Sequence, residues 1–268
     1  MAPRFSLAHL TVLGCPPAEA IQIAAETGYD FMSLRIMPLE LPGEPRYPLA
    51  RDPAMLRETR AALTQTGIKL CDVEVARISD DRTVEDYCPA LEVAAELGAR
   101  HVTAACYSKD PGYLAASFAR LCELAAPLGM TVDLEFITFS DVSTLARAHA
   151  MVRESGCSNA GILIDTLHFD RAQATMAELN AIPPTLFHFA QLCDARQAIA
   201  PSREDQIRTA RGERLYLGEG AIPVKEIVAH LPDIPYALEI AHGERQQELG
   251  YKEFARQCLV TARRYLCD

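Results

Sequence analysis

The sequence predicts an α/β protein whose one domain, residues 1–268, is a single-domain (β/α)8 TIM barrel, and three observations support this prediction. The chain has 268 residues, 49% of them hydrophobic, which is near the usual length of one such barrel. Apolar strand-like runs alternate with amphipathic helical patterns from end to end. The runs are nearly continuous in apolar residues, which is typical of parallel strands covered by helices on both faces. Because no G-x-G-x-x-G follows any run, a closed barrel is favoured over a doubly wound open sheet.

The first half of the chain repeats a strand, a helix and a glycine. The expected strands are 5–13, 31–37, 69–78 and 101–107, and the expected helices are 17–28, 53–67, 86–98 and 112–129. Left-handed helix ends are expected at Gly28, Gly67, Gly98, Gly129 and Gly156. The segment 38–52 contains four prolines, so we interpret it as a fixed lid or a subunit contact.

The second half supplies four more strands and the longest connection. The strands are expected at 131–137, 161–169, 186–194 and 236–240, and a last helix at 246–266. The charged connection 195–222 is long enough to favour a functional or mobile loop. Its arginines are expected above the barrel rim, although each could equally be a solvated charge: Arg196, Arg203, Arg208, Arg211 and Arg214.

Polar side chains close most of the expected strands. In a barrel of this kind the active site lies at the carboxyl ends of the strands. The residues expected on this rim are Arg35, Glu74, Tyr107, Glu135, Asp165, His168, His188, Gln191 and Glu239. Alternation from Gln191 places His188 on the opposite face of its strand. Arg35 and Glu74 either hold a substrate or pair with each other.

Four of these residues predict a metal site at the ends of consecutive strands, namely Glu135, Asp165, Gln191 and Glu239. Converging buried carboxylates repel one another and cost several kcal/mol unless a cation neutralises them. All-oxygen ligands favour one Mg²⁺ or Mn²⁺, whereas a histidine in the shell shifts the preference toward Mn²⁺, Co²⁺ or Zn²⁺. A single glutamate at a strand end is more often an ion-pair partner of an arginine or a helix cap than a metal ligand. Four polar residues at equivalent positions of adjacent units are harder to explain in that way. His168 either faces the same mouth or is a hydrogen-bonded core residue.

The composition of the chain disfavours two classes of partner, nucleic acids and membranes. A formal net charge of −10 disfavours a nucleic-acid surface, which needs clustered lysine and arginine. No apolar run approaches the roughly 20 residues of a membrane span, and nine cysteines without C-x-x-C spacing indicate a reducing compartment. We therefore expect a cytoplasmic protein that binds a small polyhydroxylated molecule and neither nucleic acid nor membrane. A homo-oligomer formed through 38–52 is left open.

Five short motifs together resemble the xylose-isomerase-like TIM-barrel superfamily of sugar phosphate isomerases and epimerases. They are L-E-F at Glu135, D-x-x-H from Asp165 to His168, Q-x-x-D from Gln191 to Asp194, G-E-G at 218–220 and A-L-E-I at Glu239. The resemblance covers almost the whole chain. It implies one divalent ion bound by Glu135, Asp165, Gln191 and Glu239, with His168 contacting substrate.

The chain departs from this superfamily at two positions. Ketose epimerases usually have histidine where this chain has Gln191, and a glutamine there is similar to some 3-dehydroshikimate dehydratases. Leu217 replaces the usual proline before G-E-G, so Arg211 and Arg214 are substrate anchors by loose analogy only.

The leading hypothesis is a metal-dependent isomerase or epimerase of a keto sugar or related carbonyl compound. Glu135 and Glu239 are the expected base and acid, beside a carbonyl polarised by the ion. The expected substrate contacts are Arg35, Glu74, Tyr107, Arg211 and Arg214. The alternatives are a dehydratase of a 3-dehydroshikimate-like or inosose-like substrate, with His168 as the acid, and a barrel without catalytic activity. The acidic charge and seven histidines disfavour an apurinic-site endonuclease with a trinuclear zinc cluster.

Overall fold

Eight parallel strands form a closed barrel, as the sequence predicts. The computed structural model describes residues 2–40, 44–197 and 202–267. The strands follow one another around the barrel in chain order, and β1 closes it against β8. They are β1 (Phe5–Leu7), β2 (Phe31–Arg35), β3 (Lys69–Ser79), β4 (His101–Tyr107), β5 (Thr131–Glu135), β6 (Ala160–Asp165), β7 (Ala190–Leu192) and β8 (Tyr236–Leu238).

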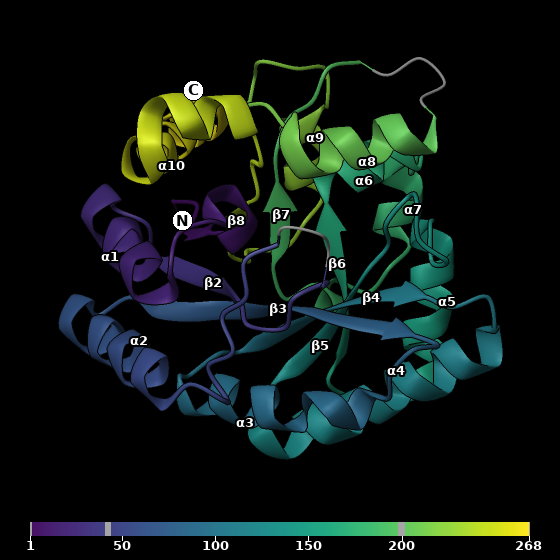
Figure 1. Cartoon of the computed structure of the whole chain (residues 1–268). Helices are drawn as coiled ribbons and strands as arrows, with labels where there is room; N and C mark the ends of the chain where they lie inside the picture. Colours follow the sequence, from purple (N-terminus) through teal and green to yellow (C-terminus); the bar gives the residue numbers. More distant parts are fainter. Residues whose placement is uncertain (1, 41–43, 198–201, 268) are drawn as a thin grey trace.

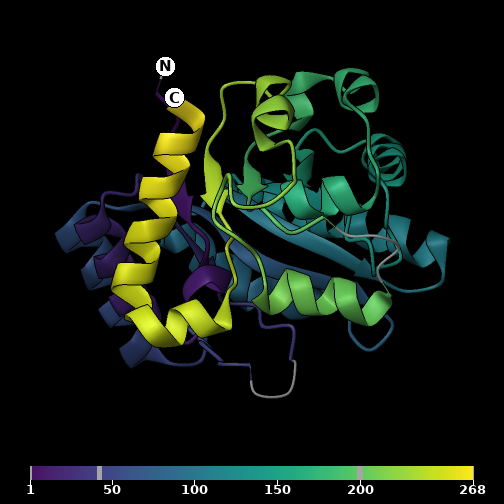
Figure 2. The same cartoon turned by 90° about the horizontal axis from the view of Figure 1, so that it is seen from above.

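Helices surround this barrel on the outside (Figure 1) and cover the outward faces of the strands. The α-helices of the described residues are α1 (Pro17–Thr27), α2 (Pro53–Thr66), α3 (Cys88–Glu96), α4 (Pro111–Ala125), α5 (Leu145–Ser155), α6 (Thr166–Arg171), α7 (Met176–Asn180), α8 (Arg203–Gly212), α9 (Val224–Ala229) and α10 (Gly243–Cys267). The last helix is kinked at Gly250, and Figure 2 shows its two arms. No helix in the described ranges has the length and apolarity that a membrane span requires.

Local sequence signals explain where several helices begin and end. The Asp52 carboxylate accepts hydrogen bonds from the backbone N–H groups of Ala54 and Met55, both at 3.0 Å, and Pro53 occupies the first helical position of α2. The same helix ends at Gly67, whose φ of +74° is left-handed. The other four glycines expected at helix ends also have positive φ, so that expectation is confirmed.

The connection after β7 differs from the expected loop, because it contains α8. Ser202 and Asp205 form a reciprocal capping box, which starts the helix despite its many charges. The seventh strand begins at Ala190 rather than 186, because Pro184–Leu186 forms a 3-10 turn. The described residues of the 38–52 segment, 38–40 and 44–52, form no helix or strand, and residues 41–43 lie outside the described ranges. The expected subunit contact therefore stays a prediction.

Asp194 fastens the end of this connection to β7. Its buried carboxylate accepts hydrogen bonds from the backbone N–H groups of Gly218, Gly220 and Ile222 at 2.9–3.0 Å. A side chain at position 220 would collide with the Ala195 carbonyl and with Asp194 itself, so glycine is required there. The Q-x-x-D and G-E-G motifs are thus two halves of one structural clamp.

We expect Asp194→Ala to lower the free energy of unfolding by about 3 kcal/mol or more, because several buried N–H groups lose their acceptor. Urea unfolding measures this change. Asp233→Ala is the control. Asp233 is exposed and forms a long ion pair of 3.8 Å with Arg4, so its loss should lower the free energy of unfolding by less than about 1 kcal/mol. Equal effects of the two substitutions would contradict the clamp.

Candidate active site and metal centre

A cavity of about 260 Å³ opens among the carboxyl ends of the strands. One part of its wall is apolar, formed by Leu10, Leu13, Leu39, Val75, Ile137 and Phe139. Its polar part is formed by the predicted residues Arg35, Glu74, Tyr107, Glu135, His168, Arg211, Arg214 and Glu239. Asp165 and Gln191 are buried behind this polar part, and both contact residues that line it. The volume suits a single small molecule.

Asp165 both ends β6 and begins α6. Its Oδ1 accepts hydrogen bonds from the backbone N–H groups of Leu167 at 2.7 Å and His168 at 3.4 Å. This cap fixes the D-x-x-H motif as one turn of helix, and His168 Nε2 lies 3.8 Å from Glu135 Oε1. Each of Glu135, Asp165 and His168 offers a ligand atom, and the three atoms lie within 4.8 Å of one another. Burial lowers the pKa of His168 to about 4, so its imidazole is neutral near pH 7.

Arg214 joins two of the predicted metal ligands. Its guanidinium Nη1 lies 2.7 Å from Asp165 Oδ2, and Nη2 lies 2.9 Å from Glu239 Oε2. Nε donates to the Ala210 carbonyl at 2.8 Å, and the residue is only 2% exposed. The sequence indicated a substrate anchor here. The structure shows in addition that Arg214 is a buried ion-pair partner of Asp165 and Glu239, and nothing in the neighbouring sequence predicts this pairing.

The rim carboxyl groups differ in their electrostatics. Burial, followed by the charge of Glu239, raises the pKa of Glu135 well above its usual value. Burial also raises the pKa of Glu239 to about 8, although Arg214 opposes this shift. Burial acts in the same direction on Asp165, but Arg214, His168 and the backbone hydrogen bond from Leu167 together outweigh it and lower that pKa. Glu135 therefore lacks the compensation that Asp165 receives.

Gln191 points its amide at the same group of oxygens. Its Nε2 donates to Glu239 Oε1 at 3.2 Å. Its buried Oε1 has no hydrogen-bond partner among the described residues. A buried acceptor without a donor is costly unless something else satisfies it. This orientation leaves the amide oxygen available as a ligand.

Arg35 and Glu74 pair with each other, which was one of the two expectations for them. The guanidinium Nη2 lies 2.9 Å from Glu74 Oε2, and Nη1 lies 3.5 Å from Glu44. His9 Nδ1 accepts a hydrogen bond from the Arg35 backbone N–H at 2.9 Å, and burial lowers the pKa of His9 to about 4. Glu44 has no role in the sequence-based prediction, because it lies in a segment without a helical or strand pattern and only the folded chain brings it to Arg35.

Some of the remaining predicted residues line the cavity, and others lie away from it. Tyr107 lines the cavity, and burial raises its pKa to about 12. Of the five connection arginines, Arg211 and Arg214 line the cavity. Arg208 instead pairs with Asp205 and Glu213 on the surface. His188 lies away from the rim, as expected, but its side chain turns toward Asp133 because the chain there precedes the strand.

The charges of this site suit a divalent cation. Five carboxyl groups, Glu44, Glu74, Glu135, Asp165 and Glu239, face three guanidinium groups, Arg35, Arg211 and Arg214, which leaves a formal −2 when every carboxyl group is ionised. The raised pKa values of Glu135 and Glu239 show that the site favours protons in place of this excess charge. One divalent ion would neutralise this excess. Buried atoms without hydrogen-bond partners among the described residues include Gln191 Oε1, Glu74 Oε1 and His168 Nδ1. The residues present therefore fit a metal ion bound by oxygen ligands, with His168 nearby.

Comparisons with known proteins agree with this geometry. Inosose isomerase of Halalkalibacterium halodurans is 24% identical over 145 residues, which are 53% of this chain and 49% of that protein. The match thus spans about half the length of this curated relative. The crystal structure of the IolI protein with a bound zinc atom superposes with a TM-score of 0.79, at 17% identity over 98% of each chain. D-allulose 3-epimerase from Methylomonas sp. in complex with D-allulose has a TM-score of 0.70, at 17% identity over 98% of this chain and 97% of that one.

At these identities the solved structures establish the fold. The family model described as xylose isomerase-like TIM barrel matches residues 21–256, which is most of the chain. The superfamily expected from the five motifs is therefore confirmed. The protein belongs to the xylose isomerase-like TIM barrel family.

Proposed function

We propose that the protein is a divalent-metal-dependent isomerase or epimerase of a keto sugar or a related polyhydroxylated carbonyl compound. The observation that carries this proposal is the group of Glu135, Asp165, Gln191 and Glu239 at a cavity of about 260 Å³ among the strand ends. The similarity to inosose isomerase and to D-allulose 3-epimerase supports the reaction class.

Glu135, Asp165, Gln191 and Glu239 would hold the ion, with Mn²⁺ or Mg²⁺ favoured by the oxygen ligands and Co²⁺ or Zn²⁺ favoured if His168 joins them. A bound divalent ion supplies a Lewis acid that stabilises negative charge on a carbonyl oxygen. Arg214 pairs with Asp165 and with one oxygen of Glu239 while Gln191 donates to the other, and these contacts orient both carboxylates.

Proton transfer is assigned to Glu135 and Glu239. Glu135 ends β5 and Glu239 directly follows β8, three strands further around the barrel, and both residues line the cavity. One carboxylate takes the proton from the carbon beside the carbonyl, and the other returns a proton to the neighbouring or inverted carbon. His168, neutral and next to Glu135, is placed to hydrogen-bond a substrate hydroxyl. Arg35, Glu74 and Tyr107 supply further polar contacts for hydroxyl groups.

A dehydratase is the second candidate, and Arg211 favours it. This residue lines the cavity, is exposed, and has no ion-pair partner among the described residues. A guanidinium without a partner at the mouth suits a substrate that carries a carboxylate, such as 3-dehydroshikimate. The sequence-based expectation makes His168 the acid of that reaction, but its neutral imidazole carries no extra proton. The departing β-hydroxyl group would therefore take the proton that the carboxylate base has removed, and His168 would hydrogen-bond that hydroxyl group.

Substrate profiling separates the two candidates. Metal-loaded protein is incubated with ketohexoses, inososes and 3-dehydroshikimate in deuterated water. We expect an isomer or epimer that carries deuterium at the exchanged carbon. Conjugated-enone or aromatic absorbance without epimer formation would establish the dehydratase instead, and absence of both turnover and bound metal would indicate a barrel without catalytic activity.

Glu239→Gln is expected to remove the rim metal and to lower kcat by about 10² or more, because one ligand and one proton-transfer group are lost together. Metal content by elemental analysis and steady-state rates measure the two effects. Glu226→Gln, at an exposed position of α9, is the matched control and should change neither. Unchanged metal content in the Glu239 variant would exclude this residue as a ligand.

Metal binding at the rim is also expected to stabilise the fold. Binding to the native state alone contributes about 2.7 kcal/mol when free metal is 100-fold above its dissociation constant. Chemical unfolding with and without Mn²⁺ measures the change. The stabilisation should disappear in Glu239→Gln and persist in Glu226→Gln.

Arg211→Gln is expected to raise KM about tenfold or more for a carboxylate-bearing substrate with little change in kcat, because a charge-assisted hydrogen bond is lost. A neutral ketose should show no such change. The control is Arg208→Gln, one helical turn away, whose partners are Asp205 and Glu213. Equal effects on charged and neutral substrates would show that Arg211 does not recognise an anion.

A further inference from the structure

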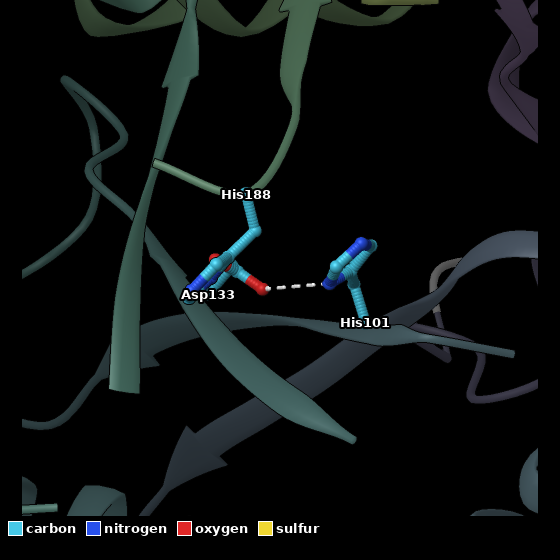
Figure 3. Close-up of side chains that lie close together, drawn as sticks. All are labelled: His101, Asp133 and His188. Atoms are coloured by element: carbon cyan, nitrogen blue, oxygen red, sulfur yellow. Dashed lines mark hydrogen bonds and ion pairs between the residues drawn. The ribbon is translucent and has the colours of Figure 1, made fainter. Parts of the chain in front are cut away.

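A second group of ligand-type side chains lies away from the rim site. His101 begins β4, Asp133 lies on β5, and His188 precedes β7. Figure 3 shows the side chains of His101, from β4, and His188, from the segment before β7, beside the carboxylate of Asp133. Each residue offers one ligand atom, and these atoms all lie within 4.8 Å of one another. The rim reaction uses none of the three.

The carboxylate of Asp133 is fully buried and depends on these histidines. Its Oδ1 lies 2.6 Å from His188 Nδ1, and its Oδ2 lies 3.8 Å from His101 Nδ1. Among the described residues the two histidines are its ion-pair partners, and no lysine or arginine joins them. A buried carboxylate without a permanent cation is costly. The Nδ1 atoms of both imidazoles thus face one anionic group.

Thr131 and Gly161 complete the surroundings of this group. The Thr131 hydroxyl donates to Asp133 Oδ2 at 2.6 Å and lies 2.8 Å from His101 Nδ1. Gly161 is the β6 partner of Asp133, and a Cβ atom there would collide with Asp133 Oδ1 and His188 Nδ1. The backbone of Gly161 lacks a positive φ, so any residue could adopt its conformation. The glycine is therefore needed to make room for these side chains.

The group is separate from the rim ligands although it shares their strands. Asp133 is two residues before Glu135 on β5, and His188 is three residues before Gln191. Successive inward positions of a strand form successive layers of a barrel. The two groups are thus at different depths, and none of the three residues lines the rim cavity.

We propose that His101 Nδ1, His188 Nδ1 and Asp133 bind a second divalent ion of the first transition row, with Zn²⁺ as the best match. Two imidazole nitrogens and one carboxylate are ligands that suit Zn²⁺ and disfavour Mg²⁺. The side chains of His101 and His188 are 18% and 21% exposed, so water can reach the remaining coordination position. Thr131 orients the carboxylate as an outer hydrogen-bond donor. The ion would join β4, β5 and the segment before β7.

The competing account is a purely hydrogen-bonded carboxylate, and an asparagine substitution separates the two. The Nδ2 of asparagine takes the place of histidine Nδ1 as a hydrogen-bond donor but is a poor metal ligand. His101→Asn/His188→Asn therefore keeps donors to Thr131 and Asp133 while removing both nitrogen ligands. Its fold is checked by circular dichroism without metal.

The test is Zn²⁺ stoichiometry by equilibrium dialysis and elemental analysis of chelator-treated protein. The unmodified chain should bind one equivalent more than His101→Asn/His188→Asn, and Zn²⁺ should raise the thermal midpoint further in the unmodified chain. Co²⁺ should give visible absorption that the double variant lacks. His230→Asn, an exposed histidine bonded to Asn180, is the control and should lose nothing.

The comparison is repeated in Glu135→Gln/Glu239→Gln. The one-equivalent difference should persist there, so that failure of the rim proposal is distinguishable from failure of this one. Equal stoichiometry with and without His101 and His188, or an equal loss in His230→Asn, would overturn the second site.

Discussion

The buried guanidinium of Arg214 is the interaction on which the rim site depends. It compensates two carboxylates from β6 and β8 that are themselves almost fully buried. Its Nε bond to the Ala210 carbonyl fixes the end of α8, and the Asp194 clamp fixes the chain that follows. Removing one partner of such a buried pair generally costs about 3–5 kcal/mol, because the remaining charge is left without compensation. The stability of α8, of the Asp194 clamp and of the rim carboxylates is therefore coupled.

The Arg214 ion pairs also determine which carboxylate oxygens of the rim remain available to a further ligand. Arg214 occupies one oxygen each of Asp165 and Glu239, while the α6 backbone and Gln191 occupy the others. A carboxylate oxygen has more than one lone pair, so these contacts orient the groups without excluding a further ligand. Glu135 has no guanidinium partner of this kind in the described ranges, and its pKa is raised accordingly. A fixed cation thus neutralises part of the rim, and an exchangeable cation would neutralise the rest.

The barrel and the grouping of polar side chains at its rim could be predicted because both follow from short-range patterns. Apolar runs ending in Glu135 and Asp165 place carboxylates on one rim once the strands are parallel, and glycines with positive φ end the helices. The helix α8 was hidden by its charges, although its capping box is readable in the sequence. The burial of Arg214 was not predictable, because its partners are 25 and 49 residues away and isolated arginines are usually exposed. The turn of His188 toward Asp133 was missed because alternation was extended beyond the strand.

Strand β5 contributes a carboxylate to each of the two groups of ligand-type side chains. Its inward residues Asp133 and Glu135 are two positions apart, so a period of two places a carboxylate in each of two layers. In the layer of Glu135, strands β6 to β8 add one amide and two carboxylates, which offer hard oxygen ligands. In the layer of Asp133, the surrounding chain adds two imidazoles and a glycine, so the ligands are softer and the space is small. Asp133 and His188 are 2.6 Å apart, whereas two ligands of a tetrahedral zinc ion lie about 3.3 Å apart. Their side chains would therefore separate by less than about 1 Å when an ion replaces the proton between them. The identity of the flanking residues, rather than the position of the carboxylate, therefore determines which metal each layer suits.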